Sequence, residues 1–386
     1  MRTWRPLFVW TAAVALAVLV LRETTVRSNM ASNPERAVAA WPAHPDALFA
    51  AGMRTIGAAA QAGRPVDPSL TDPMIAAARR TPLSPEPFLV RGVVLRGAGD
   101  EAGAGAAFMA AERRDPRSVA AHFFLADHFA RSGKMALSLT ELGRLIRLVP
   151  GSSGQLAPQI AASLKSVGGA DALLPLVADN SQLRDDLLAA LATDAGNADV
   201  IAHLAVPGQA GSWRPLLVHS LVAAGQYERA FALWARDNGV VGRPLMIDAR
   251  FGLDAKPPFG WEVSSGAAGA VETAAGGGLH LIYYRRERMV AANQVLLLPP
   301  GRYSLLFSAT AASGALARAE WQIACLADEH VIASVGLDAA RPGTRVRAAV
   351  DIPAGCGAQR LQLIGTPGDS PQTLDAVIRD LDVVQR

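Results

Sequence analysis

The sequence contains few residues of the kinds that build metal centres. It has only two cysteines, Cys325 and Cys356, in 386 residues. Two thiols cannot supply the four ligands of a structural zinc site. The seven histidines are scattered, and His122 and His128, six positions apart, do not share one face of a helix. We therefore expect neither a metal ion nor a cofactor.

Catalytic motifs and strong charge are also missing. No Gly-x-Ser-x-Gly, His-Glu-x-x-His, Walker or dinucleotide-binding phrase occurs in a suitable setting. Glycosidases need two carboxylates close together, but no motif links the glutamates of the C-terminal third (Glu262, Glu272, Glu287 and Glu320). The formal net charge is +3, without a basic block, which argues against a nucleic-acid partner. We expect a non-enzymatic protein.

One long uncharged run lies near the N-terminus, at residues 7–21, with Arg2 and Arg5 before it. Its length falls between a signal-peptide core and a membrane span of about 20 residues. We expect residues 1–22 to be an uncleaved signal anchor in a bacterial inner membrane, with the bulk of the chain in the periplasm. A cleaved signal, with a weak site at 26–28, and a buried soluble helix are the alternatives.

Export to an oxidising compartment would allow the two cysteines to form a disulfide. Cys325 and Cys356 both lie in or beside strand-like runs of the C-terminal third. Since disulfides persist in oxidising compartments, we expect these residues to form one. The alternative is two buried thiols that act as small apolar side chains.

Between residues 88 and 150 the same helical phrase occurs twice, 34 positions apart. The first copy is Phe88, Gly92, Leu95, Gly99, Ala104, Phe108, Ala111 and Pro116, and the second is His122, Ala126, Phe129, Gly133, Ser138, Leu142, Leu145 and Pro150. This pattern resembles the tetratricopeptide repeat. The resemblance implies paired helices that stack into an α-solenoid, because one pair cannot bury its apolar face alone.

The repeat region is expected to span residues 45–238, after a polar linker at 23–44. A degenerate first repeat precedes the two clear copies, and Gly225 begins a later one. Gly225 lies 92 positions after Gly133, where three intact repeats would give 102, so one unit is distorted. The resemblance implies a protein partner in the concave groove, with Arg91 and Asp127 as candidate contacts. Both are equally compatible with ordinary solvated residues.

After Gly242 the helical periodicity gives way to short alternating runs divided by glycine and proline, which predicts an antiparallel β-sandwich at 257–386 after a linker at 239–256. The ten expected strands are 261–263, 270–274, 279–285, 294–298, 303–309, 319–326, 331–337, 344–352, 360–364 and 376–384. The phrase at 296–305 and the last strand, with Asp380 and Asp382, resemble those of jelly-roll carbohydrate-binding modules. No ligand is inferred from this resemblance.

Alternation along the strands predicts that Tyr303 and Trp321 are core residues. On the strand at 279–285 one of two tyrosines must face away from the core. Sugars are bound by an exposed ring with amides and charges beside it, and the set that could supply them is Tyr284, Arg286, Arg288, Asn293 and Gln294. The alternative is an ordinary solvated edge. The charged run at 285–288 could also meet an anionic glycan or a lipid headgroup.

Three functional hypotheses follow. In the first, a membrane-anchored periplasmic adaptor binds a protein through its repeats and a glycan through its sandwich, in envelope polysaccharide assembly or export. In the second, the repeats serve a secretion, pilus or division complex, and the sandwich docks protein. In the third, the chain is a degenerate glycan-active enzyme.

Overall fold

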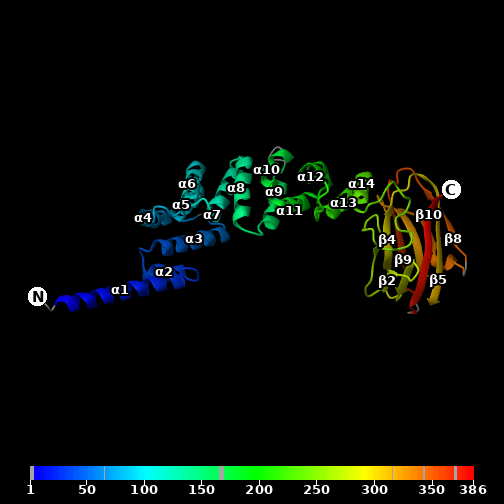
Figure 1. The fold of residues 1–386 in the computed structure, drawn as a ribbon, viewed down its shortest axis with the longest axis horizontal. Helices are drawn as coiled ribbons and strands as arrows, with labels where there is room; N and C mark the ends of the chain where they lie inside the picture. The colour runs from blue at the N-terminus through cyan, green and yellow to red at the C-terminus, as the bar shows by residue number, and fades with distance from the viewer. Residues whose placement is uncertain (1–3, 65, 165–168, 315, 342–343, 369–371) are drawn as a thin grey trace. The chain divides into compact units, whose positions relative to one another are not determined.

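A computed structural model describes residues 4–64, 66–164, 169–314, 316–341, 344–368 and 372–386. Helices fill the first part of the chain and two antiparallel sheets the last part (Figure 1), as expected for an α-solenoid followed by a β-sandwich. The chain divides into two compact units, Met1–Leu187 and Leu188–Arg386. The last helices therefore belong to the same unit as the sandwich.

The described helices are short and mostly arranged in pairs. They are α1 (Trp4–Asn29), α2 (Pro34–Ala40), α3 (Pro45–Gln61), α4 (Thr71–Arg80), α5 (Glu86–Gly97), α6 (Glu101–Arg114), α7 (Val119–Arg131), α8 (Met135–Leu148), α9 (Ser153–Ala162), α10 (Leu174–Val177), α11 (Ser181–Leu191), α12 (Ala198–Leu204), α13 (Trp213–Ala223) and α14 (Tyr227–Asp237).

Helix α1 is long and apolar enough, by length and composition, to cross a membrane. Its apolar side chains are exposed in the structure, and Phe8 is 75% exposed. The helix continues past the uncharged run, and α2 follows it, so the expected linker at 23–44 is mainly helical. Val26 and Ala37 of this segment are buried together with Ala47 of α3. The sequence suggested a linker because this segment is polar; its few apolar residues nevertheless pack against one another.

The two copies of the 34-residue phrase form the helix pairs α5–α6 and α7–α8. Gly99 and Gly133 lie at the two interhelical turns with φ of +84° and +71°, a conformation that favours glycine. Gly225, between α13 and α14, has φ of +72°. These three angles confirm that the turns of the phrase correspond.

Close helix contact is achieved differently in the two copies. A Cβ atom on Gly92 would lie 2.3 Å from Cε1 of Phe108, so the aromatic ring rests directly on the backbone of α5. In the second copy, Ser138 Oγ donates a hydrogen bond to the carbonyl of Ala126 at 2.8 Å. Phe108 is fully buried, whereas its counterpart Leu142 is half-buried. The repeat is therefore regular in its backbone and variable in its core.

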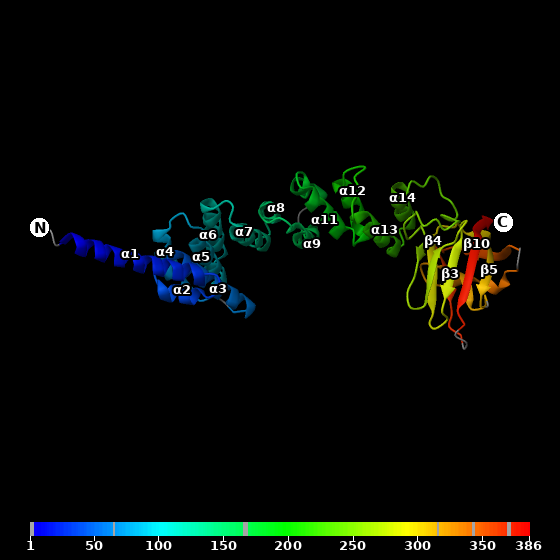
Figure 2. The same cartoon turned by 60° about the horizontal axis from the view of Figure 1, so that its bottom comes forward.

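The sandwich consists of two five-stranded antiparallel sheets, with strand orders β1-β4-β9-β6-β7 and β2-β3-β10-β5-β8. The strands are β1 (Glu262–Val263), β2 (Gly269–Thr273), β3 (Leu279–Tyr283), β4 (Met289–Leu296), β5 (Gly301–Ser313), β6 (Ala319–Cys325), β7 (Val331–Gly336), β8 (Val346–Ile352), β9 (Gln359–Gly365) and β10 (Leu374–Gln385). Figure 2 shows β3, β10 and β5 side by side in the second sheet.

All ten expected strands are present, and the largest difference is the start of β4, which begins at Met289. Tyr303 and Trp321 are buried between the sheets, which confirms the prediction from alternation. The expected linker at 239–256 contains no helix or strand, yet Phe251 within it is fully buried in the sandwich core. This segment therefore contributes to the sandwich fold.

Candidate functional site

A cavity of about 290 Å³ lies beside helices α4 and α5 in the repeat region. Its apolar lining includes Met74, Ile75 and Phe88, and its basic lining comprises Arg79, Arg91 and Arg114. Ile75 is 43% exposed although it is apolar. The cavity therefore presents an accessible apolar floor beside three arginines, and one of them is the predicted groove residue Arg91.

The three arginines are not equally available. The guanidinium of Arg114 lies 3.5 Å from the centroid of the Phe88 ring, and it donates hydrogen bonds to the carbonyls of Pro82 and Ala110. Arg79 and Arg91 are exposed, and no ion pair joins either to another described residue. None of the described residues that line the cavity is acidic, so the charged side chains of its lining are all positive. Such a cavity can accept an apolar side chain that has a negative charge beside it.

The second predicted groove residue, Asp127, does not line this cavity. Its carboxylate accepts a hydrogen bond from Arg96 and another, at 3.1 Å, from Arg131. The Arg96 guanidinium also lies 5.7 Å from the centroid of the Phe108 ring. Asp127 thus joins neighbouring helix pairs, and the structure does not bring it together with Arg91.

A buried polar cluster between α6, α7 and α8 was not anticipated from the sequence. His122 is 1% exposed, and its Nδ1 lies 2.7 Å from a carboxylate oxygen of Glu141. Its Nε2 lies 2.9 Å from the Pro116 carbonyl, which can only accept, so Nε2 carries hydrogen. Arg144 donates to Glu141 at 3.0 Å and to Glu112 at 2.7 Å.

Glu112, His122 and Glu141 offer ligand atoms within 4.8 Å of one another, a grouping that the scattered histidines did not suggest. Arg144 already pairs with both carboxylates. The arrangement is therefore a hydrogen-bonded ion network that joins two helix pairs. The three residues lie on three successive helices, and the packing of those helices brings them together.

The five residues predicted to contact a glycan do not form one surface. Tyr284, 37% exposed, lies with the exposed Arg286 and Arg288 in the turn between β3 and β4. Asn293 is half-exposed on β4 and donates to Glu262 at 3.0 Å. Gln294 is fully buried and donates to the Ile247 carbonyl, so it is unavailable to a surface ligand. Alternation along a strand places Asn293 and Gln294 on opposite faces.

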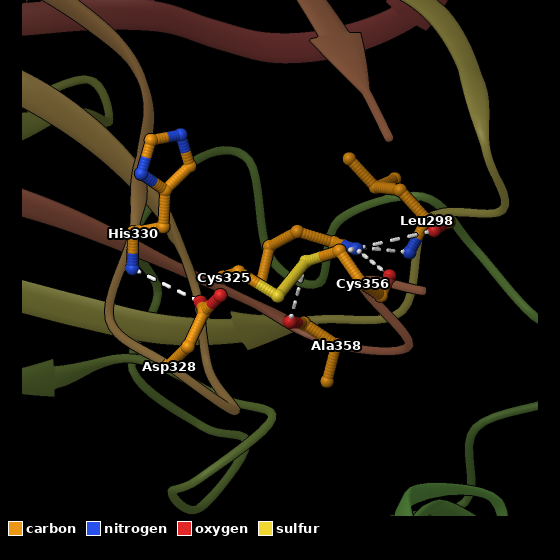
Figure 3. Close-up of a disulfide and its surroundings, with 7 residues drawn as sticks. Leu298, Cys325, Asp328, His330, Cys356 and Ala358 are labelled. Atoms are coloured by element: carbon orange, nitrogen blue, oxygen red, sulfur yellow. Dashed lines mark hydrogen bonds between the residues drawn. A yellow bond between two sulfur atoms is a disulfide. The ribbon is translucent and has the colours of Figure 1, made fainter. Parts of the chain in front are cut away.

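Cys325 and Cys356 form the expected disulfide, which joins the end of β6 to the loop before β9 (Figure 3). Both residues are buried. The Gln359 side chain donates to the Cys356 carbonyl at 2.9 Å and accepts from Leu298 N–H at 2.9 Å. The disulfide therefore belongs to a hydrogen-bonded junction that also holds Leu298, in the segment after β4.

His280 on β3 lies between two carboxylates on the neighbouring strands. Its Nε2 is 2.9 Å from Asp375 on β10, and its Nδ1 is 3.0 Å from Glu272 on β2. Hydrogen bonds first from Asp375 and then from Glu272 raise the pKa of His280 above its ordinary value of 6.5. Burial acts in the opposite direction and is outweighed. The strand register places Glu272 directly opposite His280 and Asp375 diagonally across from it. Alternation within β3 alone did not identify this group.

No protein-family model matches this chain, and no curated protein matches it. Among solved structures, one similar chain is TmCBM61 in complex with β-1,4-galactotriose, at 15% identity and a TM-score of 0.26, over 38% of this chain and all of that one. Another is the APC/C hetero-tetramer Cut9–Hcn1, at 15% identity and a TM-score of 0.26, over 58% of this chain and 47% of that one. These scores are too low to indicate what this chain binds.

Proposed function

We propose that this chain is a non-enzymatic, membrane-anchored periplasmic adaptor that acts in envelope polysaccharide assembly or export. Helix α1 would hold it in the inner membrane, with residues 7–21 in the bilayer. The helical repeats would bind a protein partner, and the sandwich would bind a glycan. The disulfide agrees with an exported sandwich, because such bonds persist in oxidising compartments.

The cavity beside α4 and α5 is the observation that carries the protein-binding part of this proposal. Its floor exposes Ile75, and Arg79 and Arg91 stand beside it. Burying an apolar side chain there would supply affinity, and the arginines would select a segment with acidic residues. The proposed partner segment is therefore an amphipathic acidic helix or strand.

The test uses the full chain in phosphatidylcholine nanodiscs and fluorescence anisotropy. The probe is a fluorescent peptide with leucine on one helical face and glutamate on the other, and its control has glutamine in place of glutamate. We expect the Arg79→Glu, Arg91→Glu double variant to weaken binding of the acidic peptide at least tenfold. Arg113→Glu is the matched control, an exposed arginine on α6 that does not line the cavity, and should change binding less than twofold.

Two results would contradict the proposal. One is equal binding of the acidic peptide and the glutamine peptide, since charge would then contribute nothing. The other is unchanged binding of the acidic peptide by the double variant. Affinity should also fall as salt is raised, because exposed charges are screened over about 8 to 10 Å at physiological ionic strength.

A further inference from the structure

A row of polar side chains crosses the first sheet of the sandwich from edge to edge. The strand register pairs Glu262 on β1 with Asn293 on β4, and Asn293 with Gln362 on β9. Gln362 pairs in turn with Gln322 on β6, and Gln322 with Ser334 on β7. We call these five residues the amide row. They lie at one level on five adjacent strands.

The row lies on the outer face of the sheet. Trp321 and Ile323, which flank Gln322 on β6, are buried in the core between the sheets. Leu361 and Leu363 flank Gln362 on β9 in the same way. Because successive side chains of a strand point to opposite faces, both glutamines point away from the core, and both are half-exposed.

Within the part of the chain that the structure describes, the side chains at the two ends of the row form hydrogen bonds, whereas the two glutamines at its centre do not. Asn293 donates to Glu262 at 3.0 Å at one end. At the other end Ser334 donates to Glu320, on β6, at 2.5 Å. The side-chain amides of Gln322 and Gln362 form no hydrogen bond with any other described residue. Two adjacent amides are thus left with all their donors and acceptors available.

We propose that the amide row binds a neutral, polyhydroxylated glycan chain laid across the strands. An amide has two donors and an acceptor oxygen, and a sugar hydroxyl both donates and accepts, so each glutamine can form paired hydrogen bonds with a saccharide. Strands about 4.8 Å apart give a row about 19 Å long, enough for an extended oligosaccharide. This inference rests on the glycan part of the proposed function and gives it a site different from the Tyr284 turn.

The charge pattern selects the class of glycan. Glu262 is one end of the row, and Glu320 on β6 accepts a hydrogen bond from Ser334 at the other end. A carboxylate accepts hydrogen bonds but repels a polyanion. The row itself contains no arginine or lysine, and Arg360, two positions before Gln362 on the same face of β9, is paired with Glu329 at 3.5 Å. A neutral chain fits this pattern better than an acidic one, whereas the arginines of the 284–288 turn would favour the acidic one.

The test uses the full chain in micelles of a zwitterionic detergent, which has no sugar headgroup to compete. Isothermal titration calorimetry would measure binding of cellohexaose, mannohexaose and galactohexaose, all neutral, and of hexagalacturonate, which is anionic. We expect at least one neutral hexasaccharide to bind more tightly than hexagalacturonate. The Gln322→Ala, Gln362→Ala double variant should weaken that binding at least tenfold.

Gln385→Ala is the matched control, an exposed glutamine on β10 of the other sheet, and should change the affinity less than twofold. If the double variant melts at a lower temperature, Gln322→Glu is tested in its place. This variant keeps the side-chain shape but removes the amide donors, so it should still weaken binding.

Three results would overturn the proposal: no neutral hexasaccharide binds, binding survives both glutamine substitutions, or hexagalacturonate is preferred. Preference for hexagalacturonate that is lost in Arg286→Ala, Arg288→Ala would move the glycan to the turn and leave the proposed function standing. Absence of any glycan binding would remove the glycan part of that function, and the peptide test on the repeats would remain independent of it.

Discussion

Replacing Gly92 with alanine tests whether close helix contact is the basis of the repeat. The new Cβ would lie 2.3, 2.6 and 2.9 Å from three carbons of the Phe108 ring, where carbon atoms normally stay about 3.5 to 4.0 Å apart. The ring is fully buried and must move by more than about 1 Å to restore such a contact. Overpacking of this kind costs about 1 to 3 kcal/mol, and the clash here places Gly92→Ala at the upper end of that range.

Helix propensity acts in the opposite direction, because alanine is favoured over glycine in a helix by about 1 kcal/mol. The net expectation is a loss of about 2 kcal/mol in the α5–α6 pair. Gly57→Ala provides the matched control. Gly57 lies in α3, is exposed, and has nothing within 4 Å of its Cβ position, so alanine there should stabilise that helix by about 0.5 to 1 kcal/mol.

Hydrogen–deuterium exchange with mass spectrometry measures the stability of the α5–α6 pair by itself. A local measurement is needed because the chain has more than one compact unit. Peptides from residues 86–114 should exchange about 30-fold faster in Gly92→Ala, since 1.36 kcal/mol corresponds to a factor of ten. In the Gly92→Ala, Phe108→Leu double variant the clash is relieved, so alanine should add little to the cost of Phe108→Leu alone. If Gly92→Ala slows exchange as Gly57→Ala does, the contact described here does not limit helix approach.

Three further predictions concern the buried network, the disulfide and His280. His122→Ala should destabilise the α7–α8 pair by about 1 to 3 kcal/mol, because the buried Glu141 loses one hydrogen-bond partner and keeps Arg144; slow exchange retained in residues 119–148 would argue against this. Cys325→Ser should destabilise the sandwich by about 3 to 4 kcal/mol, since the bond closes a loop over a sequence separation of 31 residues; tryptophan fluorescence during urea unfolding, with and without reductant, measures it. His280 should titrate above 6.5. Its raised pKa stabilises the folded chain below that value, and the contribution is lost as the pH rises through the folded pKa. An NMR titration that places His280 at or below 6.5, with His280→Gln for assignment, would contradict this.

Local patterns in the sequence were sufficient to predict most of the fold. The repeat pattern predicted that Gly99 and Gly133 lie at the interhelical turns, and both have positive φ there. Alternation predicted that Tyr303 and Trp321 are buried, which the structure confirms. The segment at 239–256, expected to be a linker, has no helix or strand, but its Phe251 reaches the sandwich core. Hydrophobic periodicity cannot detect a single buried residue in an irregular segment.

The candidate sites depend on contacts between distant residues, which local patterns do not contain. Asn293 and Gln294 seemed equivalent in the sequence, but a strand places them on opposite faces, and only the structure shows which one is buried. Gln322 and Gln362 are 40 positions apart, and they become neighbours only because β6 pairs with β9 in one register. A shift of one residue in that register would turn one glutamine into the core. The same pairing that buries Trp321 and Leu363 therefore sets the two amides side by side on the surface, so the stability of the sandwich core and the geometry of the proposed glycan site have a common cause.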